Sequence, residues 1–355
     1  MKHYRFALLM IILSIVMCAC QKKDALPSSD TTTPRTDIFT TGPQPVPSES
    51  EEYISTSRDL GMLGIGVPEG YYSDGISPCV DYPGGEMRLP FFISSSGRIQ
   101  EVGIGILLFL DGQPQPYRLE GETEYTYLHT FYPSEDTITL DFYFVPVTGT
   151  EGDALEFYAM SLLRPDYYPS QGQARTMVYS DGATVAGMRL IYQQTPPEAD
   201  IPAPVIRLKD VQVSQQDCSF EDIAGWTAID MKTKVQDRDT INGIPSNLPN
   251  RIYEITPESI VDLHYELWGA EALQCNYVIF VDNIPISSSE GIPIPMPLTS
   301  GKKTVLDAKL TMTGFTGESA IYAVRIPRNY YTTDTDGFLQ PIPCRFLLAG
   351  ESPNK

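Results

Sequence analysis

The chain has 355 residues, and 42% of them are hydrophobic, so it can form about two domains with packed cores. Its 45 Asp and Glu residues outnumber its 25 Lys and Arg residues, and the formal net charge is −20 at pH 7. A surface this acidic repels phosphate backbones, so we expect no nucleic-acid partner.

Residues 1–19 have the features of an export signal. Lys2 and Arg5 give a basic start, residues 6–17 are almost all apolar, and the small residue Ala19 precedes Cys20. The apolar run is too short to span a bilayer comfortably. The segment resembles a bacterial lipoprotein signal peptide with its lipobox.

The resemblance implies that a cysteine is acylated after cleavage. Cys20 is the expected lipidation site because Ala19 precedes it, whereas Cys18 follows the bulky Met17. Diacyl modification would anchor the protein durably at the extracytoplasmic face of the membrane, and we expect it on the cell surface. The segment departs from the usual lipobox at two positions, so an ordinary secretory signal and an uncleaved anchor stay open. The type of envelope also stays open.

Composition divides the rest of the chain. Residues 20–55 are rich in Ser, Thr, Pro and Asp, and we expect a flexible spacer because such a segment cannot bury enough apolar surface to become ordered. A second proline-rich stretch, 196–204, is expected to link two domains, 56–195 and 205–355. The rest of the chain contains no run of about 18 consecutive apolar residues, so we expect no further transmembrane segment there.

The two expected domains contain matching segments in the same order. Residues 107–114 match 278–285, and four shorter pairs follow: 140–144 with 306–310, 157–160 with 321–324, 166–168 with 329–331, and 188–190 with 344–346. Random matches would not keep their order along the chain, so we predict an internal repeat.

The matching segments have the pattern of β-strands. Apolar residues in 140–144 and in 306–312 alternate with more polar ones, which buries one face of a sheet. Tyr158 and Tyr322 occupy matched, inward positions, and we expect core packing for both.

Turn signals complete the fold prediction. Asp111-Gly112 and Asp282-Asn283 directly follow apolar runs and suit the positive φ angles of tight hairpins. Short strands in a chain with 27 Gly and 30 Pro predict an all-β fold of two tandem antiparallel β-sandwiches. The organisation resembles tandem immunoglobulin-like modules of bacterial surface proteins, and this resemblance implies a fold but no function.

Few residues suited to catalysis follow the signal. His129 and His264 are the two histidines, and we expect each to be a partnered or solvent-facing strand residue. The GxxxxGK[ST], HExxH and GxSxG motifs are absent, and residues 21–355 contain no CxxC pair. We therefore expect no cofactor, no metal site and no enzymatic activity.

Two acidic segments deserve testing. Asp334 and Asp336 could supply oxygen ligands to calcium, but the distal Glu of an EF-hand loop is missing, so a solvated loop is expected. Glu120, Glu122 and Glu124 could contribute paired carboxylates for glycan hydrolysis. A charged loop is the preferred interpretation of this cluster.

Four cysteines follow Cys20: Cys79, Cys218, Cys275 and Cys344. Outside the cytoplasm they could form disulfides in three pairings. Cys275 and Cys344 both lie on apolar strand-like runs, so a disulfide between them is the first to test. Four buried thiols are the alternative.

Adjacent tyrosines are candidates for ligand contact: Tyr71, Tyr72, Tyr168 and Tyr331. Neighbours on an extended chain point to opposite faces, so one ring of a pair can be exposed. Exposed tyrosines suit binding to sugars or proteins, whereas a corner tyrosine bonds to backbone. The pairs containing Tyr168 and Tyr331 recur in both halves, which favours the structural role.

The sequence as a whole predicts a membrane-anchored extracytoplasmic lipoprotein that is not an enzyme. It would bind an unknown protein or glycan partner, or serve as a structural module of the surface. The alternative is an extracytoplasmic hydrolase that acts on glycans through paired carboxylates.

Overall fold

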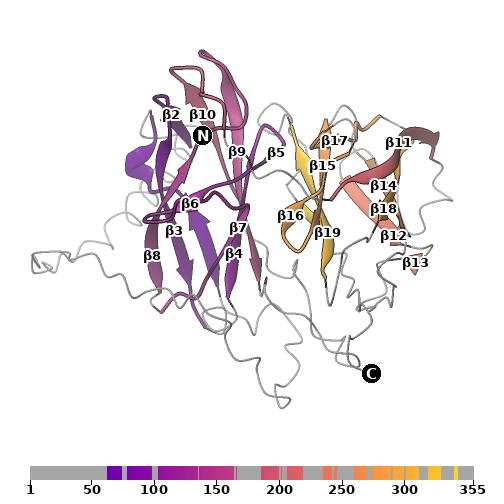
Figure 1. Cartoon of the computed structure of the whole chain (residues 1–355), viewed down its shortest axis with the longest axis horizontal. Coiled ribbons are helices and arrows are strands. Elements are labelled where there is room, and N and C mark those ends of the chain that lie inside the picture. The colour runs from indigo at the N-terminus through magenta and orange to yellow at the C-terminus, as the bar shows by residue number, and fades with distance from the viewer. Residues whose placement is uncertain are drawn as a thin grey trace, which may run out of the picture. The chain divides into compact units, whose positions relative to one another are not determined.

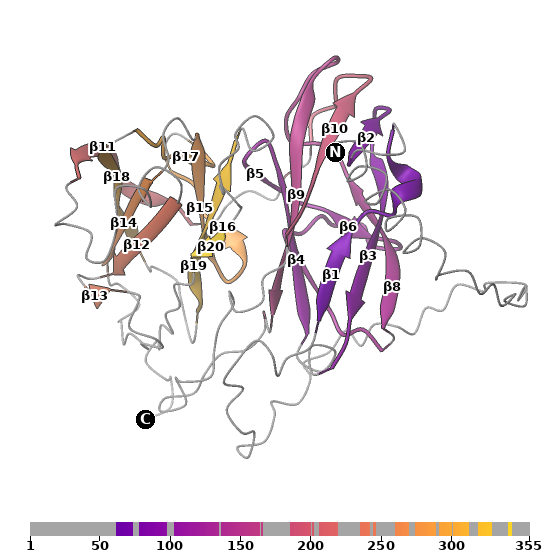
Figure 2. The same ribbon diagram turned by 180° about the vertical axis from the view of Figure 1, so that it is seen from behind.

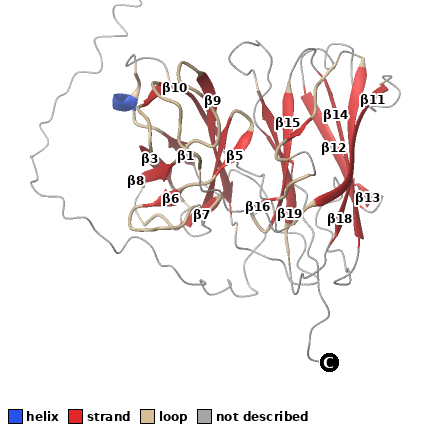
Figure 3. Cartoon of the chain, turned by 45° about the horizontal axis from the view of Figure 1, so that its top comes forward, coloured by secondary structure: helices blue, strands red, loops and turns tan. Residues whose placement is uncertain are grey.

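A computed structural model describes residues 62–73, 78–97, 103–134, 136–163, 165, 185–199, 201, 206–218, 235–241, 244–245, 260–269, 274–288, 291–299, 301–311, 319–328 and 340–342. The chain divides into residues 1–37 and a second unit, 38–355, which contains all the described residues. The described elements are strands apart from one short 3₁₀ helix, η1 (Glu69–Tyr71), as Figure 3 shows. The all-β prediction is confirmed.

The first half is a sandwich of two sheets (Figure 1). One sheet has the order β1 (Leu63–Gly66), β3 (Met87–Ser95), β8 (Thr137–Phe144) and β6 (Arg118–Leu119). The other has the order β2 (Cys79–Tyr82), β10 (Val185–Tyr192), β9 (Ala154–Leu163), β4 (Ile104–Leu110) and β5 (Gln113–Gln115), and β7 (Leu128–Phe131) pairs with β4. The pairings are antiparallel except for β2 with β10, which is parallel.

The second half also has two sheets, seen from behind in Figure 2. One has the order β11 (Leu208–Asp217), β18 (Lys302–Thr311), β14 (Ile260–Gly269), β12 (Val235–Ile241) and β13 (Ile244–Pro245). The other has the order β16 (Ile284–Pro285), β15 (Cys275–Val281), β19 (Ile321–Pro327) and β20 (Gln340–Ile342), and β17 (Ile294–Pro295) pairs with β15. The pairings between these described strands are all antiparallel.

The strand pairings repeat between the halves. β4 pairs with its hairpin strand β5, with β7 and with β9, and β9 pairs with β10; β15 pairs in the same way with β16, β17 and β19, and β19 with β20. Both predicted turns have positive φ, with values of 44° and 77° at Asp111 and Gly112 and of 50° and 66° at Asp282 and Asn283. The predicted repeat is therefore present in the fold.

Alternation along the outer strands agrees with the sequence. In β8, Ile138, Phe142 and Phe144 are buried, and the residues between them are more exposed. In β18, Asp307 and Lys309 are exposed between buried apolar residues. Each half thus buries one face of its outer sheet in its own core.

A third apolar cluster joins the halves, and we call it the interface layer. It consists of alternate residues of β4, β9, β15 and β19 and of the residue before β19: Leu107, Phe109, Tyr158, Met160, Leu162, Val278, Phe280, Ala320, Tyr322, Val324 and Ile326. The rings of Phe109 and Phe280 meet edge to face, with centroids 6.2 Å apart. These two residues are matched in the repeat, so equivalent positions of the two halves contact each other.

The strands at the interface layer are buried on both faces. Leu108 and Leu110 of β4 belong to the core of the first half, and Leu107 and Phe109 belong to the interface layer. Every residue of β4 and of β15 is buried. A strand covered on both faces has no polar side, which explains the unbroken apolar runs in these two strands.

The prediction that Tyr158 and Tyr322 pack in a core is confirmed, and that core is the interface layer. Both are buried, with 2% and 1% of their surface exposed, but neither lies in the core of its own half. Their side chains point to the opposite face of the sheet and pack in the interface layer. Alternation along a strand places successive side chains on opposite faces of the sheet. Tertiary packing determines what covers each face.

Candidate functional site

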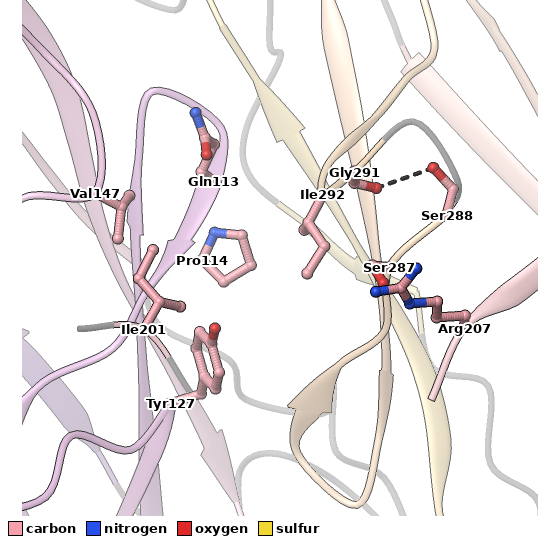
Figure 4. Close-up of a pocket in the computed structure, with 10 residues that line it drawn as sticks. All are labelled: Gln113, Pro114, Tyr127, Val147, Ile201, Arg207, Ser287, Ser288, Gly291 and Ile292. Atoms are coloured by element: carbon pink, nitrogen blue, oxygen red, sulfur yellow. Dashed lines mark hydrogen bonds between the residues drawn. The ribbon is translucent and has the colours of Figure 1, made fainter. Parts of the chain in front are cut away.

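A pocket of about 450 Å³ lies beside the interface layer (Figure 4). Pro114, Tyr127 and Val147 line it from the first half, and Ile201 lines it from the segment between the halves. Its other side is formed by residues of the second half. A volume of this size lies within the range of small-molecule sites.

Buried hydrogen bonds hold the wall on the side of the first half. Gln115 follows Pro114 in β5, and its side chain is fully buried. Its amide nitrogen donates to the Val145 carbonyl at 3.0 Å, and its amide oxygen accepts from the Val147 backbone N–H at 3.0 Å. Buried polar groups that are fully satisfied fix geometry, so this wall is well defined.

Backbone contacts hold the opposite wall. Arg207 pairs with Ser287 in a parallel bridge, and the Leu208 N–H donates to the Ser287 carbonyl at 2.8 Å. The Ser288 hydroxyl donates to the Gly291 carbonyl at 2.9 Å. The start of β11 and the segment after β16 are thereby joined next to the pocket.

Two polar side chains of the pocket lack partners among the described residues. Tyr127 is 7% exposed, and its hydroxyl points towards Pro114 in Figure 4. Burial raises its pKa to about 12, so the hydroxyl keeps its proton at neutral pH. The Arg207 guanidinium extends towards Ser287 and forms no hydrogen bond or ion pair with a described residue.

The charge of the pocket contrasts with that of the chain. Among the described residues that line it there is one cation, Arg207, and no carboxylate, although the whole chain carries −20. By comparison, Arg88, Arg118 and Arg328 each pair with a carboxylate at 2.6 to 3.0 Å. Arg207, by contrast, is exposed and has no carboxylate partner among the described residues.

Further contacts fasten the halves around the interface layer. Arg328 donates to the Asp111 carboxylate at 3.0 Å, which links the second half to the β4–β5 turn. At Gly112 of that turn, a Cβ atom would lie 2.3 Å from the Asn276 side chain. The turn approaches β15 as closely as a glycine allows.

The predicted tyrosines take different positions. Tyr71 is 52% exposed in η1, whereas Tyr72 packs against the core of the first half. The described part of the chain thus shows one exposed and one covered ring, and neither lines the pocket. The remaining predicted site residues lie outside the described residues: Cys20, Tyr168, Tyr331, Asp334, Asp336 and Cys344.

The predicted disulfide stays a prediction. Cys275 is buried at the start of β15, opposite Pro327 of β19, and Cys344 lies outside the described residues. β20 runs from opposite Arg325 to opposite Ala323, so the described chain leads away from Cys275 as it approaches position 344.

Both histidines lie in strands with side-chain partners, as predicted. The His129 Nε2 of β7 lies 2.9 Å from the Thr126 hydroxyl and 3.0 Å from the Tyr117 carbonyl. The His264 Nδ1 of β14 lies 2.7 Å from an Asp307 carboxylate oxygen of β18.

The acidic cluster before β7 is an exposed loop, also as predicted, with Glu120, Glu122 and Glu124 all exposed. The Glu122 carboxylate accepts from the Leu119 N–H at 2.8 Å and lies 3.7 Å from the His129 Nε2.

Sequence reasoning did not find the pocket. Its lining residues come from segments far apart in the chain, and no local motif marks them. Ile201 offered the one usable signal, because it is a large apolar residue within a proline-rich stretch.

None of the described residues form a helix with the length and apolar character of a membrane span. They also contain no cluster of three or more side chains able to hold a metal ion.

Known proteins offer distant likenesses. No family model and no curated protein matches the sequence. Fibronectin(III)-like modules of Clostridium thermocellum CbhA align over 81% of this chain and 95% of theirs, with 8% identity and a TM-score of 0.20. A putative membrane-anchored protein of Corynebacterium diphtheriae aligns over 81% and 59%, with 8% identity and a TM-score of 0.20.

The C-terminal domain of the Streptococcus pyogenes antigen I/II-family protein AspA aligns over 81% of this chain and 99% of its own, with 7% identity and a TM-score of 0.19. Matches this weak carry no argument about function. The description of the chain as two β-sandwiches rests on its own strand pairings.

Proposed function

We propose that the protein is an extracytoplasmic lipoprotein, anchored through Cys20, that acts as a non-enzymatic binding module. Residues 1–20 support the anchor, because they combine a basic start, an apolar run and a cysteine after a small residue. Residues 21–55 would serve as the spacer between the anchor and the folded body.

The interface layer supports the proposed binding function. It packs eleven apolar side chains between the two sandwiches, next to the pocket. Burying that much apolar surface resists relative movement of the halves, so both walls of the pocket are fixed before a ligand arrives. Because the walls of a preformed site are already ordered, ligand binding does not lose conformational entropy to ordering them.

Lipidation is tested by labelling cells with palmitate and separating membrane from soluble fractions. We expect the wild-type protein and the matched variant Cys18→Ala to carry label and to sediment with membranes. Cys20→Ala should lose both properties. Retention of label by Cys20→Ala would overturn the anchor.

Binding is tested with the neutral dye N-phenyl-1-naphthylamine, which fluoresces in apolar cavities. Ile201 at the pocket and Val213 on β11 are each 42% exposed, so their Trp variants form a matched pair. We expect one dye site per chain, and Ile201→Trp should weaken it about tenfold while Val213→Trp leaves it unchanged. No binding, or an equal effect of both variants, would overturn the pocket as the site. Release of sugars from envelope glycans by the purified protein would overturn the non-enzymatic role.

A further inference from the structure

We infer that the pocket binds a small anionic ligand with an apolar body. This inference names the ligand class of the binding module proposed above and rests on that proposal. It follows from two features of the described residues: a guanidinium that has no partner among them, and a wall of apolar side chains.

Arg207 indicates that the ligand carries an anionic group. Its side chain is exposed and forms no hydrogen bond or ion pair with a described residue, and no carboxylate is among the described residues that line the pocket. A guanidinium presents a planar set of donors that matches a carboxylate or sulfonate in a bidentate geometry. The many acidic residues elsewhere would repel such an ion, so Arg207 marks the place where it can approach.

The pocket wall opposite Arg207 indicates that the ligand also has an apolar part. Pro114, Val147 and Ile201 face the pocket together with Ile292, as Figure 4 shows. About 450 Å³ holds a small molecule and not a folded partner. Removing the ligand's apolar surface from water at this wall would add to the affinity.

Tyr127 adds a directed hydrogen bond. Its ring is buried, and its hydroxyl has no partner among the described residues. The hydroxyl and the guanidinium lie on opposite walls, so a ligand with acceptors at both ends of its apolar body would satisfy both.

Two dyes with the same ring system test the ligand class. The first is 1-anilinonaphthalene-8-sulfonate, and the second is the neutral N-phenyl-1-naphthylamine. Both are titrated into the full-length wild-type protein, Arg207→Gln, and Arg88→Gln as a control. Arg88 lies on β3 away from the pocket and is paired with Asp141, so its variant removes the same charge elsewhere.

We expect Arg207→Gln to weaken the sulfonate dye about tenfold or more, which corresponds to losing one charge-assisted hydrogen bond. The neutral dye should bind Arg207→Gln as it binds wild type, and Arg88→Gln should leave both affinities unchanged. Arg207→Lys should restore part of the loss, because the charge returns without the planar fork.

Results that contradict the ligand class can be distinguished from results that contradict the binding module. If both dyes bind at the pocket and Arg207→Gln weakens neither, or weakens both equally, the ligand class is wrong while the proposed binding module stands. If neither dye binds at the pocket, the inference and the binding half of the proposed function fall together.

Discussion

The two halves share their apolar contacts and a backbone hydrogen bond at each hairpin, but not the hydrogen bonds of their matched tyrosines. The Asp111 N–H donates to the Glu156 carbonyl at 2.8 Å, and the matched Asp282 N–H donates to the Ala320 carbonyl at 2.9 Å. The buried tyrosines that follow these acceptors diverge: Tyr158 donates to the Glu156 carboxylate, whereas Tyr322 donates to the Asn283 side chain across the turn.

The difference shows which features the repeat requires. Backbone bonds and apolar positions are set by the shared strand pairings, so both halves keep them. A buried hydroxyl needs only some partner, and either a neighbouring carboxylate or a turn amide provides one. Substitutions at matched positions can therefore test whether the halves are equivalent.

The largest effect is expected at the interface layer. Phe109 and Phe280 are fully buried and touch each other. Phe109→Ala and Phe280→Ala should each reduce the free energy of unfolding by about 3–5 kcal/mol, because each leaves a large cavity. Urea denaturation measures the loss, and the double variant should lose less than the sum because the two rings share a contact.

Phe91→Ala provides the control, because Phe91 is equally buried but lies in the core of the first half. The two interface variants should separate the unfolding of the halves into two transitions, and Phe91→Ala should not. A single transition in every variant would contradict a separate role for the interface layer.

A smaller effect is expected from ion pairs on matched sheets. Lys303 of β18 lies 2.5 Å from Glu266, whose side chain is 5% exposed. Lys303→Met would leave this buried carboxylate without its lysine and should cost about 1–3 kcal/mol. Arg88→Met in the first half breaks a pair whose arginine is 64% exposed, and we expect little change in thermal unfolding. Equal losses would show that burial does not set the difference.

Substitutions in the two hairpin turns should differ by about 1–2 kcal/mol in their effect on the free energy of unfolding. Gly112 has a φ of 77° and no room for a Cβ beside Asn276, so Gly112→Ala should destabilise. Asn283 already carries a side chain at a φ of 66° and accepts a hydrogen bond from Tyr322, so Asn283→Asp, which keeps an acceptor oxygen there, should change stability little. Chemical denaturation of both variants makes the comparison, and equal costs would refute the close approach at Gly112.

The smallest effect is a dependence on pH. Burial lowers the pKa of His129, although the Tyr117 carbonyl and the Glu122 charge oppose the shift. The unfolded chain therefore binds a proton near pH 6.5 that the folded chain takes up only at lower pH. Stability should fall as the pH drops from about 6.5 to the lowered pKa.

His129→Gln should make this part of the pH dependence flatter, because glutamine does not titrate. Urea denaturation at pH 7.5 and 5.5 compares the variant with wild type. An unchanged difference between the two pH values would show that His129 does not contribute.

Local sequence was sufficient for much of the fold. Asp111-Gly112 and Asp282-Asn283 predicted both hairpins, because few residue pairs adopt positive φ without strain. Alternating residues predicted the buried face of β8 and β18. The order of matched segments predicted the repeat.

Contacts between distant segments could not be predicted in this way. The unbroken apolar runs in β4 and β15 contained a signal of burial on both faces, but nothing local identifies the other half as the cover. The parallel pairing of β2 with β10 and the meeting of Tyr127 with Arg207 at one pocket depend on how the sheets pack. The chemistry of the site therefore had to come from the structure.

The interface layer also constrains how the protein is made. The first half completes its pairings at Tyr192, whereas β19 ends at Pro327, roughly 130 residues later. At a synthesis rate of about 5–20 residues per second, the nascent first half exposes Leu107, Phe109 and Met160 to solvent for roughly 7 to 27 seconds. That interval is when the chain is most open to self-association and would profit most from a chaperone.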